Sequence, residues 1–316
     1  MSVFLAKRFL TFIATLLGAT VLTFLALEIL PGDPAAVILG IDAPESAIQA
    51  LREKWGLDRP ILERYFSWLG DLVTLQFGVS YTYSTPVIEL VQARLAITIP
   101  LALMAMVLSA FVAFGLGLYA ASRHNKPGDV TVMSISQLGI SVPNFWLALL
   151  LILLFAVNLR WFASGGFPGW QNGLWPAFKA LLLPAVALAT VQGAILARFT
   201  RSAVLDTMRE DYVRTARAKG LSRRATLWRH VLRNAMIPVI TIMGLQFANL
   251  LAGTIIVEEV FAMPGLGRLI LQAIGNRDLV VVRDVVLMLA ALVVFINFLV
   301  DVLYAVIDPR LKPHDV

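Results

Sequence analysis

Long apolar runs without charged residues recur along the chain and predict its main elements. Each run is near or above the roughly 20 residues that an α-helix needs to cross about 30 Å of hydrocarbon. The last run crosses only if its helix continues to about Val306, which places Asp301 near one end of the span. The six runs are Phe9 to Leu27, Leu95 to Ser122, Val130 to Leu159, Ala180 to Ala197, Asn234 to Val257 and Val285 to Val300. We therefore predict an all-α membrane protein with six transmembrane helices.

The runs divide the chain into three parts. Residues 1–30 form an N-terminal transmembrane helix, residues 31–94 an extracytoplasmic insertion, and residues 95–316 a five-helix core with a charged loop at 210–233. The first run is longer than the apolar region of a typical signal peptide, which favours an uncleaved span. The insertion fits two roles equally well. It is either a lid packed on the outer face, or a surface that contacts a substrate-delivering protein or guards the pathway entrance.

The composition supports a membrane protein and indicates its orientation. Hydrophobic residues make up 59% of the chain, charged residues 15%, and the mean hydropathy is +0.81, which excludes a soluble domain of this length. Basic residues flank the first span at Lys7 and Arg8 and number ten between residues 198 and 233. The positive-inside rule therefore predicts cytoplasmic N- and C-termini. The net charge of +6 reflects this topology, with anionic membrane lipid as a secondary partner and no nucleic acid.

The charged segment from Glu210 to Arg233 lies between two long apolar runs and predicts a helical hairpin. Asp211 to Lys219 is rich in helix formers, Gly220 can end that helix in a left-handed conformation, and Ser222 can cap a second helix. The second helix shows apolar residues at three- and four-residue spacing, which predict a docked face opposite a wet, arginine-rich one. These residues are Leu221, Ala225, Trp228, Leu232 and Ala235.

Three strings of the sequence resemble the B-type permease subunit of the bacterial dipeptide, oligopeptide and nickel ABC importers. The first is Tyr212, Thr215-Ala216-Arg217-Ala218-Lys219-Gly220 and then Leu232-Arg233-Asn234-Ala235 with Pro238. The others are Leu30-Pro31-Gly32-Asp33-Pro34 and Val257 to Arg268, and a C-terminal string from Asp301 to Arg310 extends the likeness over the chain. The chain departs from the general permease motif, because Arg214 and Thr215 replace its Glu and first Ala, and His230 and Arg233 replace its Ile and Pro.

The resemblance implies a type I ABC-importer permease fold in the bacterial inner membrane. It implies as partners a homologous second permease subunit, two ABC ATPase subunits and an extracytoplasmic substrate-binding protein. In such proteins the hairpin loop seats in a groove of the ATPase and couples nucleotide-driven closure to the membrane helices. The residues that the resemblance assigns to this coupling are Tyr212, Arg214, Thr215, Ala216, Arg217, Lys219 and Gly220.

The sequence shows no nucleotide-binding motif and no metal-binding motif. No Gly-x-x-x-x-Gly-Lys-Ser/Thr string occurs, so we predict no ATPase activity in this chain and no bound cofactor. By the resemblance, ATP and Mg are used by the partner ATPase subunits. The chain has no cysteine, and His124, His230 and His314 lie far apart, so no metal site is predicted.

Polar residues in and beside the spans are candidates for the pathway or its gate. They are Glu28, Asp33, Asn144, Gln192, Gln246, Glu258, Pro264 and Gly265. Each has a structural alternative, because carboxylates cap helices, amides join helices, and the segment from Pro264 to Asn276 fits an interfacial helix. For Asp301 we favour an ion pair with Arg198 or Arg201, or hydration, over a role in proton coupling.

We therefore predict a permease subunit that forms half of the pathway of an ATP-driven importer for peptides or related small solutes. The scarcity of buried ionisable groups argues against transport driven by a proton gradient. A stand-alone secondary carrier or channel, whose basic loop only binds lipid, is the alternative, and a membrane enzyme ranks third. The substrate stays open among a dipeptide, an oligopeptide, glutathione, an opine and a nickel chelate.

Overall fold

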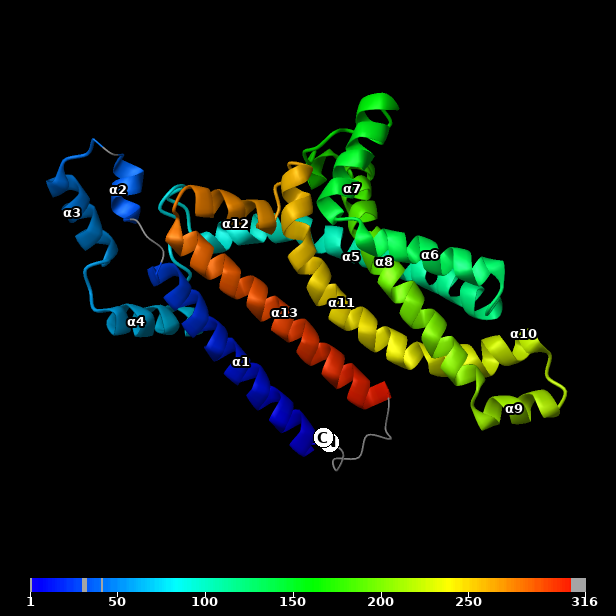
Figure 1. The fold of residues 1–316 in the computed structure, drawn as a ribbon. Coiled ribbons are helices and arrows are strands. Elements are labelled where there is room, and N and C mark those ends of the chain that lie inside the picture. Colours follow the sequence, from blue (N-terminus) through cyan, green and yellow to red (C-terminus); the bar gives the residue numbers. More distant parts are fainter. Residues whose placement is uncertain (1, 30–32, 41, 308–316) are drawn as a thin grey trace. The chain divides into compact units, whose positions relative to one another are not determined.

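The computed structural model describes residues 2–29, 33–40 and 42–307, and its regular structure is helical (Figure 1). The α-helices are α1 (Ser2–Ile29), α2 (Pro34–Leu39), α3 (Glu45–Trp55), α4 (Ile61–Val73), α5 (Val87–Ser122), α6 (Pro127–Ser141), α7 (Asn144–Leu151), α8 (Leu174–Met208), α9 (Asp211–Ala218), α10 (Arg223–Thr226), α11 (Leu232–Val260), α12 (Leu266–Gly275) and α13 (Leu279–Ile307). Two π-helical segments, η1 (Ile152–Asn158) and η3 (Leu227–Val231), and a 3-10 turn, η2 (Trp170–Asn172), complete the set. The predicted all-α class is confirmed for these residues.

The described part of the chain contains five helices long and apolar enough to cross a membrane, or six if α6 and the helix that follows it count as one span. The run from Val130 to Leu159, predicted as one span, is not one continuous helix. Its two halves, Pro127–Ser141 and Asn144–Asn158, are bent by 98°. The cause is local: Pro143 disfavours helical backbone at Val142, and both residues are extended, with ψ of 121° and 136°.

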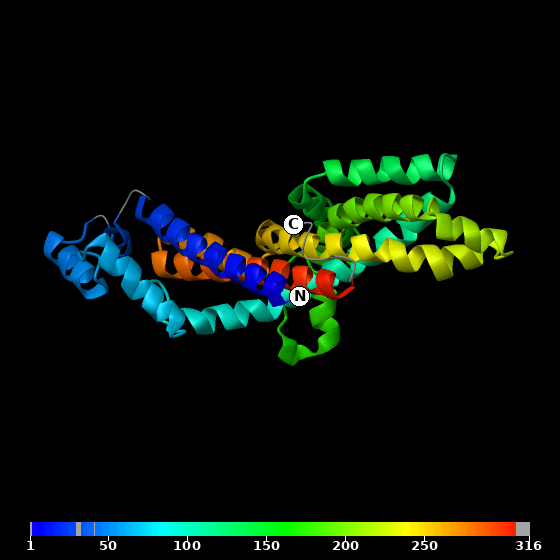
Figure 2. The ribbon, with the colours of Figure 1, turned by 90° about the horizontal axis from the view of Figure 1, so that it is seen from below.

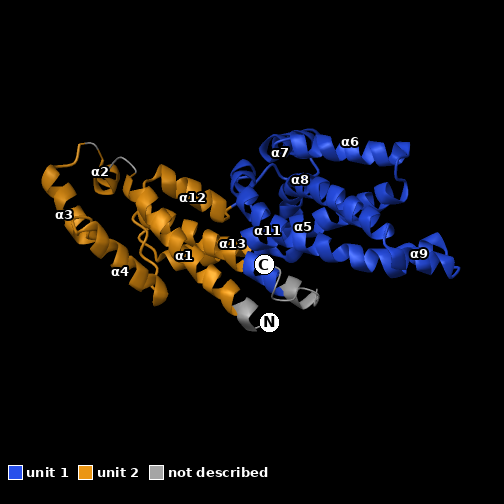
Figure 3. Cartoon of the chain, turned by 60° about the horizontal axis from the view of Figure 1, so that its bottom comes forward, with its two compact units in different colours: residues 1–5, 98–263, 296–316 blue, residues 6–97, 264–295 orange. Residues whose placement is uncertain are grey.

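The chain folds into two compact units that are interleaved in the sequence (Figure 3). Unit 1 comprises residues 1–5, 98–263 and 296–316, and unit 2 comprises residues 6–97 and 264–295. The insertion at 31–94 therefore belongs to the same unit as most of α1, as α12 and as the first half of α13. We describe each unit by itself.

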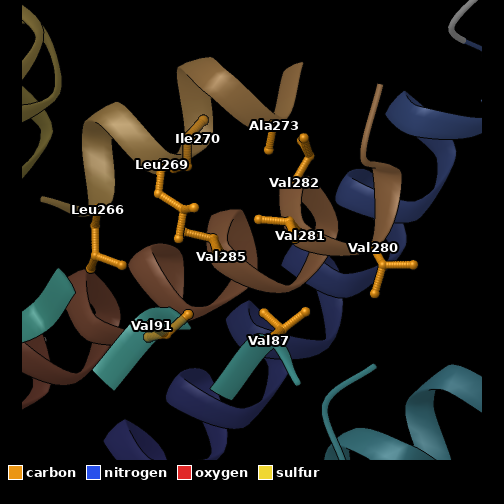
Figure 4. Packing of buried hydrophobic residues seen from close by; sticks show 10 residues of the cluster. All are labelled: Val87, Val91, Leu266, Leu269, Ile270, Ala273, Val280, Val281, Val282 and Val285. Carbon is orange, nitrogen blue, oxygen red and sulfur yellow. The ribbon is translucent and has the colours of Figure 1, made fainter. Parts of the chain in front are cut away.

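The core of unit 2 is formed by the start of α5, by α12 and by the start of α13 (Figure 4). Its buried members are Val87, Val91, Leu266, Leu269, Ile270, Ala273, Val280, Val281, Val282 and Val285. The apolar residues of α12 that lie in this cluster pack onto α5 and α13. The interpretation of this segment as an interfacial helix stays a prediction. A second cluster, Phe24, Trp68 and Leu287, joins α4 to α1 and α13.

Two buried carboxylates, Asp278 directly before α13 and Asp284 within it, hold the loop between α4 and α5. Asp284 accepts hydrogen bonds from Trp68 Nε1 at 3.0 Å, from the backbone of Gly78 at 3.2 Å and from Arg283 Nε at 3.2 Å. Asp278 accepts from Ser80 Oγ and from the Thr82 backbone N. Both side chains are fully buried, so these bonds supply the partners that a buried carboxylate requires.

In unit 1, α8 is the central helix, and it packs against α6, α7 and α11 (Figures 1 and 2). The second half of α5 approaches it closely through a small residue. A Cβ at Gly117 would lie 2.7 Å from the carbonyl oxygen of Ala197 and 2.7 Å from Cβ of Thr200. Gly117 is therefore required for the observed contact of α5 with α8. Gly115, two residues earlier, faces open space.

We expect Gly117→Ala to destabilise unit 1 by about 1–3 kcal/mol, because the added methyl group overlaps a backbone atom that cannot rotate away. Thermal unfolding of the purified chain in detergent measures this loss. Gly115→Ala is the matched control on the same helix and should unfold at or above the wild-type temperature, since nothing lies within 4 Å of its Cβ. Equal unfolding temperatures for the two variants would contradict the packing argument.

Candidate functional site

The predicted hairpin is present as a pair of short helices at one end of unit 1 (Figures 1 and 2). After α8 ends at Met208, Glu210 adopts extended backbone and occupies the N-cap position of α9, without a side-chain capping hydrogen bond. The chain then turns at Gly220 and continues through α10 and η3 into α11, so that Arg223–Val260 forms one long, span-length helical stretch. The hairpin is thus continuous with two membrane helices.

Both predicted turn signals are confirmed. Gly220 has a φ of +90°, which favours glycine, and its backbone N–H donates to the carbonyl of Arg217 at 2.9 Å. Leu221 donates to the carbonyl of Ala216 at 3.3 Å, which completes the end of α9. Ser222 Oγ accepts from the backbone of Ala225 at 3.2 Å and caps α10.

The inner face of α9 is fixed to the body of unit 1 by a small apolar core. Val213 is completely buried and Ala216 is 7% exposed. They pack in one cluster with residues of α5, α8, η3 and α11, namely Ala121, Val204, Val231 and Ala235. Ala216, which the resemblance assigned to coupling, therefore packs on the body of unit 1, and its role in coupling stays a prediction.

The outer face of α9 carries the other residues assigned to coupling. Arg214, Thr215, Arg217, Lys219 and Gly220 are exposed, and Tyr212 is 41% exposed. The Tyr212 hydroxyl accepts a hydrogen bond of 2.8 Å from Asn234 Nδ2, which lies in the first turn of α11. This bond joins the outer edge of α9 directly to the helix that enters the membrane.

The apolar face predicted for the second hairpin helix is confirmed only in part. Ala235 is buried and Leu221 and Leu232 are partly buried, as predicted, but Trp228 is 56% exposed and Ala225 is exposed. Thr226 and Val231 are buried instead. Trp228 and Val231 lie in the π-helical segment η3, where each turn holds an extra residue and the side chains are rotated relative to an α-helix. The exposed Trp228 borders a cleft of about 570 Å³ with Phe114, Leu118 and Met236.

Glu28 and Asp33, predicted as pathway candidates, have structural partners within unit 2. Glu28 Oε1 pairs with Arg64 Nη1 at 2.9 Å. Asp33 caps α2 by accepting from the backbone of Ala35 at 3.0 Å, and it pairs with Arg52 at 2.7 Å. The bond to Asp33 raises the pKa of the Arg52 guanidinium above its usual value. Asp33 thus fulfils the capping role that the sequence left open for it, whereas Glu28 forms an ion pair.

Glu258, Pro264 and Gly265 lie on either side of the boundary between the two units. Glu258 is completely buried near the end of α11 and accepts from Thr98 Oγ1 at 2.6 Å. This contact lies within unit 1. Gly265 immediately precedes α12, whose first residues belong to the core of unit 2. A gating role for this segment stays a prediction.

Asn144, Gln192 and Gln246 lie on α7, α8 and α11, three helices that contact one another. Asn144 begins α7 at the bend, and its Nδ2 lies 3.7 Å from the Cβ position of Gly253 on α11. The side-chain oxygens of Asn144 and Gln192 are buried without a hydrogen-bond partner among the described residues, while Gln246 accepts from Asn249 at 3.3 Å. Of these three amide side chains, only Gln246 has a hydrogen-bond partner for its oxygen among the described residues. A pathway role stays a prediction for all three.

The sequence did not indicate the buried Asp129, which is the partner of Arg201. Asp129 is 2% exposed in the first turn of α6 and receives hydrogen bonds of 2.6 and 2.7 Å from Arg201 of α8. Arg198 donates to Gln137 at 2.9 Å. Arg201 thus pairs with a carboxylate on α6, and the favoured ion pair of Asp301 stays a prediction. The one feature of the sequence that could have indicated a structural role for Asp129 is its position directly after Pro127 and Gly128, at the start of an apolar run.

Among the described residues, no group of three or more His, Asp or Glu side chains could hold a metal ion. The hairpin offers cationic, exposed side chains on a rigid support, and no arrangement of a nucleophile with a base. Its geometry suits contact with another macromolecule.

Comparison with known families gives the class of protein. Residues 113–313 match the family described as "Binding-protein-dependent transport system inner membrane component", and residues 1–102 match the N-terminal region of such components. The chain belongs to this family, and it is a permease subunit of an ABC importer.

Individual relatives and one solved structure agree with this class. The chain is 42% identical to a peptide transport system permease protein of Brucella abortus over 312 residues, with 99% of each protein covered. It is 38% identical to the dipeptide transport system permease protein DppB of Alkalihalophilus pseudofirmus, with 97% of this chain and 98% of that protein covered. The structure of the MetNI methionine ABC transporter matches 70% of this chain and 97% of its own with a TM-score of 0.58 at 18% identity, which confirms the permease fold.

We expect Gly220→Ala to loosen α9 without removing any contact, because nothing lies within 4 Å of the Cβ position and the cost is that of a left-handed backbone, about 1–2 kcal/mol. Hydrogen exchange of the α9 amides in the detergent-solubilised chain should be about tenfold faster or more. Gly220→Asn should show a smaller increase, since asparagine tolerates this conformation. Unchanged exchange in the alanine variant would argue against Gly220 as the element that ends α9.

Proposed function

We propose that this chain forms half of the translocation pathway of an ATP-driven importer for short peptides, and that the hairpin at 210–233 contacts an ATPase subunit. The proposal includes a homologous second permease subunit, two ATPase subunits that use ATP and Mg, and an extracytoplasmic substrate-binding protein. This chain itself supplies no hydrolysis. The peptide substrate is supported by full-length identity near 40% to relatives named for peptide and dipeptide transport.

The observation that carries the coupling role is the two-sided construction of α9. Its inner face is held by Val213 and Ala216 to three longer helices, whereas its outer face presents Arg214 and Arg217 to solvent. A force applied to the outer face would therefore reach α8 and α11 as a displacement of a packed unit. A hairpin that only bound lipid would not require this fixation.

We expect Arg214→Glu combined with Arg217→Glu to abolish capture of the ATPase subunits when the chain is co-expressed with them and purified in detergent. Two reversed charges at a protein interface replace attraction by repulsion, so retained ATPase should fall at least tenfold. ATP hydrolysis of the recovered complex gives a second readout. Lys219 is unchanged in the wild-type chain and in the variant, so the two proteins differ only at positions 214 and 217 of the hairpin.

The matched control is Arg123→Glu, which reverses an exposed charge between α5 and α6 and leaves the hairpin intact. It should retain the ATPase subunits. If the hairpin variant and the control retain equal amounts of ATPase, the coupling assignment is excluded, and the alternative of a lipid-binding hairpin gains support.

The proposed orientation places the hairpin and both termini in the cytoplasm and residues 31–94 outside. Because the chain has no cysteine, single cysteines report sidedness directly. In intact spheroplasts a membrane-impermeant maleimide should label Glu63→Cys, which is exposed on α4, and should label Lys219→Cys only after the membrane is disrupted. Labelling of Lys219→Cys in intact spheroplasts would reverse the proposed topology.

A further inference from the structure

Unit 2 contains a cavity of about 640 Å³. It lies between α1, α3, α4, the loop at 78–84 and the start of α13. This volume falls in the range of small-molecule sites. All of the helices that line it belong to the same unit, so the cavity is complete within unit 2.

The charges that line the cavity favour an anionic group. Four basic side chains reach it, from Lys54, Arg59, Arg64 and Arg283, against the two carboxylates of Glu28 and Asp71. Arg64 Nη1 forms an ion pair with Glu28 Oε1 at 2.9 Å, and Arg59 Nη1 lies 3.8 Å from Glu63 Oε1. Lys54 makes no hydrogen bond or ion pair within the described residues, which leaves its ammonium group available to a ligand.

Arg283 is held in position and still has donors to offer. Its guanidinium lies 4.6 Å from the centre of the Trp68 ring, and its Nε donates to Asp284 at 3.2 Å. In the described part of the chain, its two Nη groups make no hydrogen bond. A guanidinium fixed through Nε and a ring face is preorganised to bind a carboxylate through Nη.

The cavity also contains an aromatic wall and a carboxylate of opposite sign. Trp55 and Tyr81 stack with ring centres 3.8 Å apart and planes within 12°. Burial raises the pKa of the Tyr81 hydroxyl above its usual value, so this hydroxyl stays protonated and can donate to an anion. Asp71 is exposed at the cavity and carries the charge that complements an ammonium group.

We propose that this cavity is a binding site for a short peptide, with the peptide's C-terminal carboxylate on Lys54 and Arg283, its ammonium group toward Asp71, and a side chain on the aromatic wall. The choice of a peptide rests on the proposed function; the anionic, amphipathic class of ligand rests on the cavity. Such a site on the insertion would hold substrate on the permease itself, apart from the substrate-binding protein.

The test uses the full-length chain in nanodiscs of phosphatidylcholine and equilibrium dialysis with radiolabelled Ala-Phe. We expect saturable binding of the free acid and binding of Ala-Phe amide about tenfold weaker or more, because a hydrogen bond to a charged group is lost. Lys54→Gln, at an exposed position, should weaken binding of the acid about tenfold. Arg283→Gln should do the same if its fold survives.

Lys179→Gln is the control, since it removes an exposed charge from unit 1 and Lys179 does not line this cavity. Equal affinity for acid and amide, an unchanged Lys54→Gln variant or no saturable binding would overturn the proposal. Loss of Ala-Phe binding in nanodiscs containing phosphatidylglycerol would also overturn it, because a lipid phosphate would then be the resident anion. The same preparation is also tested for capture of the ATPase subunits. If it captures them but does not bind Ala-Phe, the peptide site is excluded while the proposed function stands.

Discussion

Buried carboxylates determine which distant segments of this chain meet. A carboxylate removed from water is stable only when donors surround it, so each one fixes the position of the segments that provide those donors. Asp284 and Asp278 bind the loop after α4 to the start of α13, across about two hundred residues of sequence. Asp129 joins α6 to α8 through Arg201, and Glu258 joins α11 to α5 through Thr98. Apolar packing fills the space between these points.

The interleaving of the two units follows from these contacts. The first half of α13 packs with the insertion in unit 2 because its carboxylates and its valines both face that segment. Its last residues belong to unit 1, where Val300 lies so close to α11 that a Cβ at Gly244 would be 2.1 Å away. A single helix thus contributes to two cores, and the linear division into a first helix, an insertion and a core does not describe this packing.

The features that the sequence predicted well are those governed by local physical chemistry. Charge-free length predicted the spans, and Gly220 and Ser222 predicted the turn and cap of the hairpin, because left-handed backbone and helix capping each depend on few residues. The errors arose where the path of a helix or the direction of its side chains depends on a bend or an extra residue elsewhere in the helix. The bend at Pro143 interrupts an apolar run of sufficient length, and the π turn at Leu227–Val231 shifts the face that η3 buries.

The pairing of ionisable groups was the hardest part to predict, for a physical reason. A sequence shows that Asp129, Arg198, Arg201 and Asp301 exist, but the partner of each depends on helix rotation and on the distance between helices. The same limit applied to Glu28 and Asp33, whose role as partners of arginines in the insertion requires α3 and α4 to be in place.

The division of charge within the hairpin bears on how it could transmit motion. Coupling requires a surface that a partner can hold and a support that does not yield, and one short helix of eight residues provides both. Such a helix has little stability of its own, so its rigidity must come from its neighbours. Val213 and Ala216 supply that support through apolar packing. The hydrogen bond from Asn234 to Tyr212 adds to it by fixing the orientation of α9 relative to α11. Arg214 and Thr215, where the chain departs from the general permease motif, are both exposed, so they can differ from the motif without disturbing the support of the hairpin.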